Sequence, residues 1–434
     1  MKFISNSLKH FIKLETSSSI ILFLVSIIAI VWANSSYGYI YEDLWHHKFT
    51  IGFADTNFHL SKSLILWIND GFMAIFFFVI GLEVKREILV GELTTLRKAS
   101  LPIFAAIGGM LFPVLIFLLL NKGKAGVEGW GIPMATDIAF TLGILKLLGK
   151  RVPLGLKIFL TAFAIVDDIG AVLVIAIFYS ANIQWDLITY AMLLFGGVSF
   201  LSYRRIYSKY FYFLIGFFVW LLFLKSGIHP TIAGILMAFT IPIHRKVDMS
   251  EYLDAIKKQL SIFQKNKTTS NQLLTNEQIQ AVDAIENCSE KVHAPLQHLE
   301  HTLHGWVSYL IMPIFALANA GVVISFNGLG GSSHVIFNIA LALVLGNTFG
   351  ILLLSYIGVK LKLADLPKGT NFMNLLGVSL LGGLGFTMSL FIANLAYTTE
   401  SLIAASKMGI IIGSLVAGLL GYLVLRFSLA TKKQ

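Results

Sequence analysis

Apolar segments long enough to cross a membrane recur along almost the whole chain of 434 residues. A helix needs about 20 mainly apolar residues to span the hydrocarbon core of a bilayer. Hydrophobic residues make up 56% of the sequence and charged residues only 13%, whereas a soluble protein carries about 25% charged residues. The pattern predicts an all-α polytopic membrane protein. We place about twelve spans at residues 16–33, 63–82, 101–120, 130–149, 154–179, 187–203, 210–224, 228–243, 307–324, 335–359, 374–397 and 402–425.

The distribution of basic residues predicts the orientation of these spans. If the N-terminus is cytoplasmic, most of the 33 Lys and Arg residues fall in cytoplasmic loops and at the two termini, as the positive-inside rule requires. The net charge of +10 is therefore a topology signal, and we expect no nucleic-acid partner. A cleaved signal peptide ending near 31–33 is an alternative, but its removal would upset the alternation of loop charge. The single cysteine, Cys288, excludes an internal disulfide framework.

A polar segment divides the chain into two membrane parts. We expect an N-terminal membrane half at 1–243 with eight spans, a cytoplasmic insert at 244–306, and a C-terminal half at 307–434 with four spans. Thr275 and Gln278 have the spacing of a capping box, which predicts one amphipathic helix in the insert. A solvated connector is the alternative reading of this insert. Residues 40–60 are expected to form a small external hairpin.

The fourth and eleventh spans contain residues that interrupt helices. Proline removes a backbone donor and clashes with the preceding turn, and glycine loosens a helix. In lipid, the freed backbone groups must be paired internally or line a watery cavity, so paired interruptions indicate a binding site. The residues concerned are Gly131, Pro133, Thr136 and Asp137 in the fourth span, and Gly382, Gly383, Gly385, Thr387 and Ser389 in the eleventh.

Four carboxylates fall inside the predicted spans: Asp70, Asp137, Asp167 and Asp168. A charge near the bilayer centre costs about 2.5–3.5 kcal/mol on insertion scales. Asp70 alone is explained equally well as a packing residue, but Asp167 and Asp168 lie near mid-bilayer in the fifth span. Neighbouring helix positions differ by about 100°, so these two side chains point in different directions and are expected to have separate roles.

Carboxylates, a hydroxyl and freed carbonyls are ligands for a small hard cation. No histidine or cysteine lies near the aspartates in the sequence, so we expect no transition metal and no cofactor. Burial favours the protonated form of a carboxyl group, so one site can hold either a proton or a cation. This competition favours an antiporter over an enzyme. The alternatives are a sodium-coupled symporter, a non-transporting sensor of the same fold, and an intramembrane aspartyl protease, whose Tyr-Asp and Gly-x-Gly-Asp sequences this chain lacks.

Several short sequence motifs of this chain resemble those of the NhaA family of bacterial sodium/proton antiporters. "ATDIAF" at 135–140 and "AIVDDIGA" at 164–171 carry this resemblance most specifically, and it covers nearly the whole chain. Further matches are "GLEVKRE" (81–87), "KRVPLGLKIFL" (150–160), "KSGIHPT" (225–231), "LEHTLHGW" (299–306), "FALANAGV" (315–322) and "GFTMSLFIANLA" (385–396).

The resemblance implies an inverted-repeat fold in which the fourth and eleventh spans cross at their interruptions. It implies a multi-pass protein of the bacterial inner membrane that exchanges cytoplasmic Na⁺ for external H⁺ and regulates internal pH. Li⁺ is a plausible second substrate by its size and hardness. Whether two chains associate as a homodimer is left open.

The resemblance also assigns roles to residues. Asp168 would carry Na⁺ and H⁺ directly, with Asp167 as its neighbour in Na⁺ binding and proton coupling. Asp137 and Thr136 would lie at the crossing, where Asp137 offsets the helix dipoles. Supporting positions are Asn347, Thr387, Gly383 and Gly385. The pH-sensing positions at the cytoplasmic mouth map onto Glu83, Arg86, Glu87, Glu300, His301 and His304. His229 and Asp70 match positions implicated in the pH response and in subunit or periplasmic contacts.

The chain departs from the family at Asn347, where the family usually has a lysine that pairs with the first aspartate of the doublet. Lys157 cannot substitute, because it lies ten residues before Asp167 on the same helix, about 15 Å away. Without a cationic partner for Asp167, we expect protons to compete with Na⁺ up to more alkaline pH. The charge moved in each transport cycle is also expected to differ.

Overall fold

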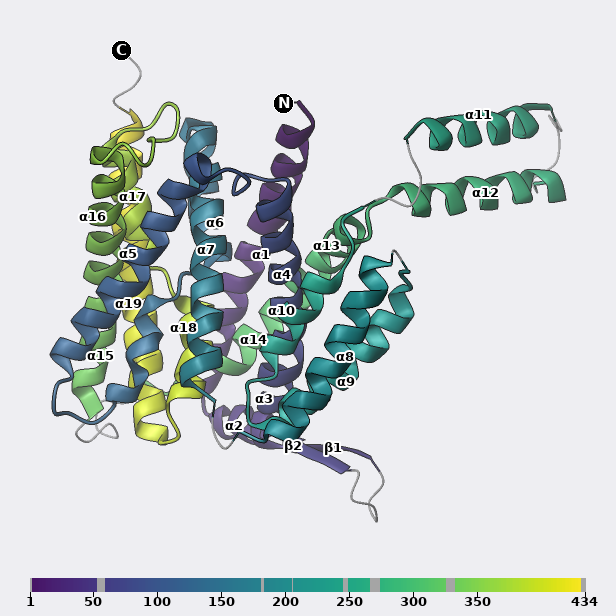
Figure 1. Ribbon diagram of the computed structural model, residues 1–434. Helices are drawn as coiled ribbons and strands as arrows, with labels where there is room; N and C mark the ends of the chain where they lie inside the picture. The colour runs from purple at the N-terminus through teal and green to yellow at the C-terminus, as the bar shows by residue number, and fades with distance from the viewer. Residues whose placement is uncertain are drawn as a thin grey trace.

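The computed structural model describes residues 2–52, 59–180, 183–204, 206–244, 249–265, 274–324 and 332–430. Most helices run side by side in one bundle (Figure 1). Both ends of the chain lie at one end of this bundle, which we call the terminus side, and the strands β1 and β2 lie at the opposite end, which we call the hairpin side (Figure 1). All-α polytopic architecture, as predicted, is thus present in the described residues, apart from this small hairpin.

The elements of the first part of the chain are α1 (Lys2–Ala33), α2 (Gly38–His46), β1 (Lys48–Gly52), β2 (His59–Ser63), α3 (Leu64–Trp67), η1 (Ile68–Phe72), α4 (Met73–Leu89), α5 (Leu96–Leu120), η2 (Val127–Met134), α6 (Ile138–Leu147), η3 (Gly149–Arg151), α7 (Leu154–Phe178), α8 (Trp185–Tyr203), α9 (Lys209–Ser226) and α10 (Thr231–Thr240). Those of the second part are α11 (Met249–Lys265), α12 (Asn276–Val292), α13 (Pro295–Trp306), η4 (Val307–Ile311), α14 (Met312–Asn319), α15 (Ser333–Leu341), η6 (Ala342–Gly346), α16 (Asn347–Lys360), α17 (Phe372–Gly382), α18 (Phe386–Ala396) and α19 (Glu400–Ala430).

Helices occupy all twelve predicted spans, but not every one is a long, straight helix. In the described residues, 7 helices are long and apolar enough to cross a membrane, or up to 9 if each of two sharply bent pairs is one span. The other three predicted spans fall on shorter or broken elements, which are η2 with α6, α10, and η4 with α14. The difference from about twelve therefore arises at one broken span and at two spans formed by short helical elements.

The polar insert contains more helix than the sequence analysis expects. The capping box at Thr275 and Gln278 is present and begins α12, and a second helix, α11, packs against α12. The two helices project sideways from the terminus side (Figure 1). A small hairpin is present but lies later in the chain than the predicted 40–60, because Gly38–His46 forms the helix α2. Its strands β1 and β2 pair in antiparallel register, with Lys48 opposite Ser63.

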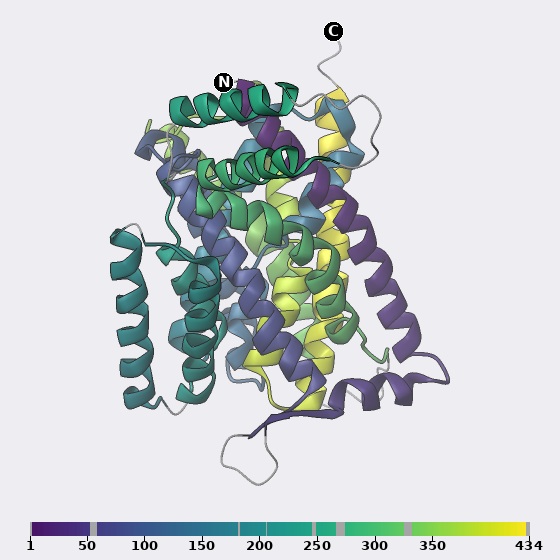
Figure 2. The same ribbon diagram turned by 90° about the vertical axis from the view of Figure 1, so that its right-hand side faces the viewer.

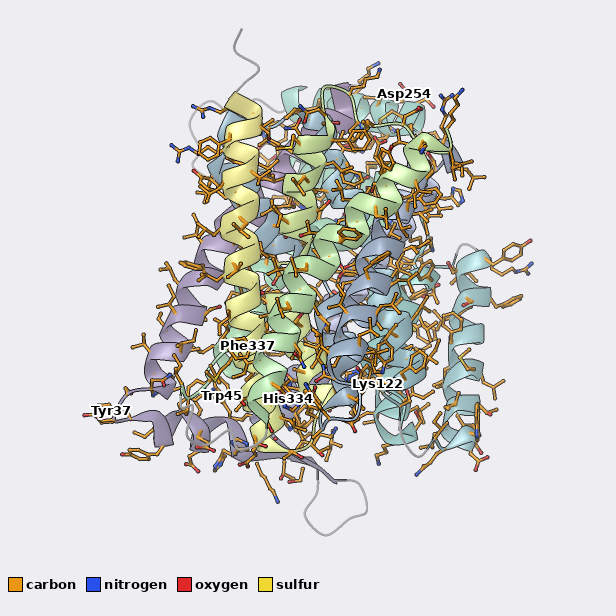
Figure 3. The ribbon with its side chains drawn as sticks, turned by 90° about the vertical axis from the view of Figure 1, so that its left-hand side faces the viewer. Tyr37, Trp45, Lys122, Asp254, His334 and Phe337 are labelled. Carbon is orange, nitrogen blue, oxygen red and sulfur yellow. The ribbon has the colours of Figure 1, made fainter. Side chains whose placement is uncertain are left out.

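The sides of the bundle carry large exposed apolar residues, whereas polar groups gather at its two ends. Leu193 and Phe217 are more than half exposed, and they lie on α8 and α9, which stand at one edge of the bundle (Figure 2). Tyr37, Lys122 and His334 lie at the hairpin side, and Asp254 lies at the opposite end (Figure 3). This distribution suits a protein whose flanks face lipid and whose ends face water.

Lysine 85 joins two neighbouring helices at the terminus side. Its Nζ, on α4, donates hydrogen bonds of 2.6 Å to the carbonyl oxygens of Phe239 and Ile241 at the end of α10. These carbonyls have no partner within their own helix, so the lysine caps α10. The α4 and α10 helices are therefore bound together by polar contacts as well as by packing.

Two helices approach so closely that there is no room for a side chain between them. A Cβ atom on Gly108 of α5 would lie only 2.0 Å from the carbonyl oxygen of Gly350 on α16. Small residues allow this backbone contact, which in lipid replaces hydrophobic burial as a source of helix association.

We predict that Gly108→Ala lowers the free energy of unfolding by about 1–3 kcal/mol, because the methyl group forces α5 and α16 apart. The measurement is the melting temperature of the purified protein in detergent. Gly196→Ala is the matched control, since no heavy atom lies within 4 Å of a Cβ at that position. Equal melting temperatures for the two variants would contradict the close contact.

Candidate functional site

The two predicted interruptions are present, and they lie side by side. The first separates η2, which ends at Met134, from α6, which begins at Ile138. The second separates α17 from α18, between Gly382 and Phe386. The backbone N–H of Asp137 in the first break donates to the carbonyl oxygen of Leu384 in the second at 2.5 Å. The breaks therefore satisfy part of each other's backbone hydrogen bonding.

The carboxylate of Asp137 caps two helices at once. Its Oδ1 accepts a hydrogen bond from the backbone N–H of Phe140 in the first turn of α6, at 3.2 Å. Its Oδ2 accepts from the backbone N–H of Thr387 at 2.9 Å and from the hydroxyl of the same residue. Thr387 lies in the first turn of α18. A negative charge between two helix N-termini offsets the positive ends of both helix dipoles.

Thr136 connects the first break to α7 and α17. Its backbone N–H donates to Asp167 Oδ2 at 3.1 Å, and its hydroxyl donates to the carbonyl oxygen of Gly382 at 2.8 Å. Gly383 and Gly385, which follow Gly382 in the second break, leave no space for larger residues. A Cβ atom would lie 2.4 Å from the carbonyl oxygen of Leu343 at Gly383, and 2.1 Å from Ser389 Oγ at Gly385.

A small cavity of about 60 Å³ lies against the breaks, which is room for a few water molecules. Asp168 lines this cavity together with Asp137, Thr136 and Thr387. The lining also includes Glu83 and His304, toward the terminus side. Oxygen-bearing side chains from α7 and from both breaks thus converge on one space, as a hard cation requires.

The two neighbouring aspartates face different surroundings, as their spacing predicts. Asp168 lines the cavity, whereas Asp167 accepts the hydrogen bond from Thr136. In the described part of the chain, Asp167 Oδ1 has no hydrogen-bond partner, and neither has Asn347 Oδ1. An unsatisfied buried polar group costs about 1–3 kcal/mol. Lys157 does not supply the missing charge, because it lies ten residues before Asp167 on α7, about 15 Å away at a rise of about 1.5 Å per residue.

A second cavity, of about 650 Å³, lies between η1, α4, α9 and α10. Its lining residues are apolar or aromatic, and they include no charged or amide side chain. Although this cavity is much larger, its chemistry does not suit an ion, so we assign the candidate ion site to the smaller cavity.

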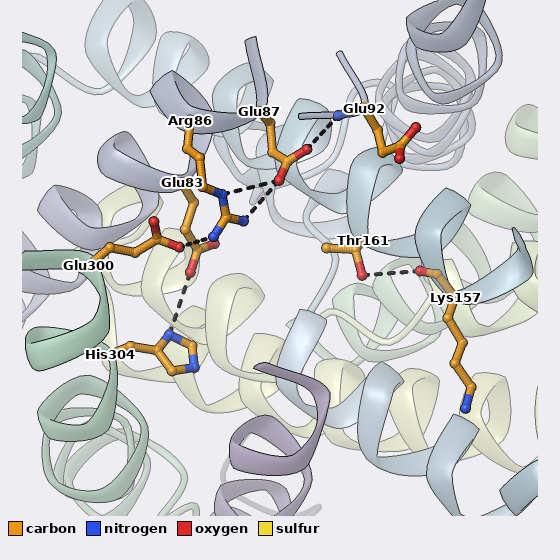
Figure 4. Close-up of polar contacts among 8 residues, drawn as sticks. All are labelled: Glu83, Arg86, Glu87, Glu92, Lys157, Thr161, Glu300 and His304. Atoms are coloured by element: carbon orange, nitrogen blue, oxygen red, sulfur yellow. Dashed lines mark hydrogen bonds and ion pairs between the residues drawn. The ribbon is translucent and has the colours of Figure 1, made fainter. Parts of the chain in front are cut away.

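The terminus side of α4 carries a network of charged residues (Figure 4). Arg86 forms ion pairs with Glu300 and, at 2.8 Å, with Glu87. The Nδ1 atom of His304 lies 3.5 Å from Glu83 Oε1. Because Glu83 and His304 also line the cavity, this network borders the space that Asp168 lines.

Burial raises the pKa of Glu300 to about 7, although the Arg86 guanidinium acts in the opposite direction. Glu300 lies on α13, before the predicted span at 307–324. Its carboxyl group therefore gains or loses a proton close to neutral pH, which most glutamates do not.

The residues linked to pH sensing lie in two places. Toward the terminus side, the structure brings together Glu83, Arg86, Glu87, Glu300 and His304, and His301 is exposed on the same helix as Glu300. Asp70 and His229 lie toward the hairpin side, where Asp70 Oδ2 is 2.6 Å from Lys62 Nζ and Asp70 Oδ1 is 3.6 Å from His229 Nε2.

Sequence reasoning missed a chain of three amides on the hairpin side. Asn319 Nδ2 donates to Asn69 Oδ1 at 3.0 Å, and Asn394 Nδ2 donates to Asn319 Oδ1 at 2.7 Å. These contacts join η1, the end of α14 and α18. Polar residues inside apolar segments were the available signal, because a lone amide in lipid needs a partner.

Comparisons with known proteins agree on one family. A family model described as Na+/H+ antiporter 1 matches residues 9–425. The Na(+)/H(+) antiporter NhaA of Oleidesulfovibrio alaskensis is 47% identical over 96% of this chain and 93% of its own length. That of Bacteroides thetaiotaomicron is 46% identical over 99% of both chains. That of Wolinella succinogenes is 42% identical over 98% of this chain and 94% of its own.

We predict that Glu300 makes stability depend on pH. Its folded-state pKa of about 7 is higher than the ordinary value of 4.5, so the folded state binds this proton more tightly than the unfolded state. The stabilisation is complete below about pH 4.5 and is lost as the pH rises through about 7.

The side chain of the Glu300→Gln variant stays neutral at every pH. As the pH rises from about 4.5 through about 7, the melting temperature of the wild type should therefore fall relative to that of this variant. The measurement is a series of thermal melts in detergent, with Glu92→Gln as the control at a more exposed position outside the Arg86 contacts. A constant difference between wild type and Glu300→Gln across the interval would refute the assignment.

Proposed function

The chain belongs to the Na+/H+ antiporter 1 family and is a multi-pass membrane antiporter of Na⁺ and H⁺, not an enzyme, and we propose that the exchange takes place at Asp168. In this proposal Asp168 holds either a proton or Na⁺, never both. Each ion is released to the side of the membrane to which the site is open. Competition for one carboxylate then couples the two flows without a cofactor.

One observation carries this proposal, namely the cavity in which Asp168 meets Asp137, Thr136 and Thr387. A carboxylate can release Na⁺ when it is protonated and bind Na⁺ when it is ionised, because only the ionised form offers a full negative charge. The carboxylate of Asp137 is already engaged by the first turns of α6 and α18. We therefore assign Asp137 to charge balance at the helix ends, and Asp168 to ion exchange, with Asp167 as its neighbour in proton coupling.

Alternating access is supported by an asymmetry between the two sides of the site. Toward the terminus side, the cavity lining reaches from Asp168 to Glu83 and His304. Toward the hairpin side, Asn394 of α18 binds Asn319. The Phe391 ring, also on α18, lies 5.7 Å from that of Phe77. In this proposal the site opens first toward the terminus side, and transport requires that the hairpin-side contacts then separate.

We propose that the ion pairs at Arg86 regulate entry to the cavity according to pH. Glu300 binds Arg86 directly and its pKa is raised to about 7 by burial. A rise in pH through neutrality therefore adds a negative charge beside Arg86, and this change can reposition Glu83 and His304 on the route to Asp168. Asp70 and His229, which the resemblance also links to the pH response, lie toward the hairpin side, away from the Arg86 ion pairs.

We further propose that Li⁺ is a second substrate, because it is a hard cation with the same charge as Na⁺. We propose that the terminus side is cytoplasmic, as the positive-inside rule indicates, and that the membrane is the bacterial inner membrane, as the family resemblance implies. A homodimer is an additional proposal.

We predict that Asp168→Asn abolishes exchange, because an amide can neither release a proton nor offer a negative charge. The measurement is an internal pH dye in proteoliposomes across pH, with Na⁺, Li⁺ or K⁺ added and no organic substrate. Asp186→Asn, at an acidic residue in the first turn of α8, is the control and should exchange normally. Full exchange by Asp168→Asn would refute the proposed site, and a requirement for an organic substrate would indicate a symporter.

We predict that Asn347→Lys changes both the pH profile and the voltage dependence of exchange. A lysine beside Asp167 would stabilise its ionised form, so proton competition should end at lower pH than in the wild type. It would also add a charged group to the transport cycle. The measurement is exchange in proteoliposomes with and without an imposed membrane potential. Identical pH profiles and identical voltage dependence would refute the role of this position.

A further inference from the structure

Two serine hydroxyls line the candidate ion cavity from elements outside the two breaks. Ser18 lies on α1 and Ser308 on η4, and both residues line the cavity together with Asp168. They are only 3% and 5% exposed, so their side chains face the interior of the bundle. Neither position is among those to which the family resemblance assigns a role.

The two serines lie at different places along the cavity. Ser308 follows His304 by four residues, so these two lining residues share a helix face. Ser19, next to Ser18, donates a hydrogen bond to the carbonyl oxygen of Ala139, which lies in the first turn of α6. Ser308 is thus near the charged residues of the terminus side, and Ser18 is near the first break.

The walls that carry the serines are otherwise apolar. In the described lining, α1 and η4 present no other oxygen-bearing side chain to the cavity. The apolar lining residues of α1, α4, η4 and α14 are Leu22, Phe76, Val79, Ile80, Val307 and Met312. A hard cation binds oxygen ligands, so the serines are the groups through which these two walls can contact an ion.

The cavity is too small for a fully hydrated ion. Its volume of about 60 Å³ leaves room for only a few water molecules. A cation that enters it therefore loses part of its hydration shell, and oxygen atoms of the protein must replace the lost water. A neutral hydroxyl does this without adding a charge, so the competition between Na⁺ and H⁺ stays at Asp168.

We propose that Ser18 and Ser308 bind the transported cation on its way to Asp168 and replace part of its lost water. This inference rests on the proposed function, because it adds ligands to the route of the same ion. A serine hydroxyl has one proton to donate and two lone pairs. It can therefore donate to a neighbouring acceptor and still offer a lone pair to Na⁺.

The test is Na⁺-driven exchange by the full-length protein in proteoliposomes at one alkaline pH, at which few protons compete. The KM for Na⁺ and the maximal rate are measured separately. Ser18→Ala and Ser308→Ala each remove one oxygen atom and are expected to raise the KM about tenfold, as loss of a supporting group commonly does at a metal site. The maximal rate should stay close to that of the wild type, because Asp168 is unchanged.

Two further variants separate ion binding from helix packing. Ser19→Ala is the matched control, because the Ser19 hydroxyl joins α1 to α6 and Ser19 is not part of the cavity lining. This variant should keep the KM of the wild type. Ser308→Cys fills nearly the same space as serine but replaces a hard oxygen with a soft sulfur, so its KM should rise as in Ser308→Ala.

The outcomes separate this inference from the function on which it rests. A raised KM in both alanine variants and in Ser308→Cys, with a normal KM in Ser19→Ala, supports the two serines as ligands. A wild-type KM in either alanine variant, whatever its maximal rate, would exclude that serine. An equal rise in Ser19→Ala would mean that α1 acts through packing, and a wild-type KM in Ser308→Cys would mean that only shape matters at this position.

Any of these contrary results overturns the inference alone if Asp168→Asn still abolishes exchange. Full exchange by Asp168→Asn would instead remove the proposed function.

Discussion

Backbone polar groups cannot be left unpaired within the hydrocarbon of a membrane, and the two broken spans meet this constraint by pairing with each other. Asp137 accepts hydrogen bonds from the first turns of both α6 and α18. Its own N–H binds the carbonyl of Leu384, and Thr136 binds that of Gly382. The same breaks that line the cavity at Asp168 therefore also hold the two spans together.

Much of this candidate site could be predicted from the sequence, because unpaired backbone groups and charges are costly inside lipid and therefore stand out in an apolar segment. Glycine and proline mark the places where a helix ends, and a carboxylate inside an apolar run is conspicuous. Asp167 and Asp168 were expected to face different ways because neighbouring helix positions differ by about 100°, and their surroundings differ accordingly. The number of full-length spans was harder to predict, since α10 has only 10 residues.

Contacts between distant segments could not be predicted in the same way. Asn69 and Asn319 are 250 residues apart in the sequence, and nothing near either one specifies its partner. Helix α11 was missed although its sequence carried a signal, because Tyr252, Ile256, Leu260 and Phe263 recur at helical intervals. The separation of Asp70 from Glu87, however, was open to prediction. The two residues are 17 positions apart on one continuous helical segment, and a rise of about 1.5 Å per residue places them about 25 Å apart.

The bond between Lys85 and the end of α10 has a mechanical consequence. It ties the α4 helix, with Glu83 and Arg86, to the element that follows His229. If α4 and α10 tilt together about their midpoint, their two ends move in opposite directions. A change of charge at one face of the membrane would then displace residues at the other face, without any change at the candidate ion site between them.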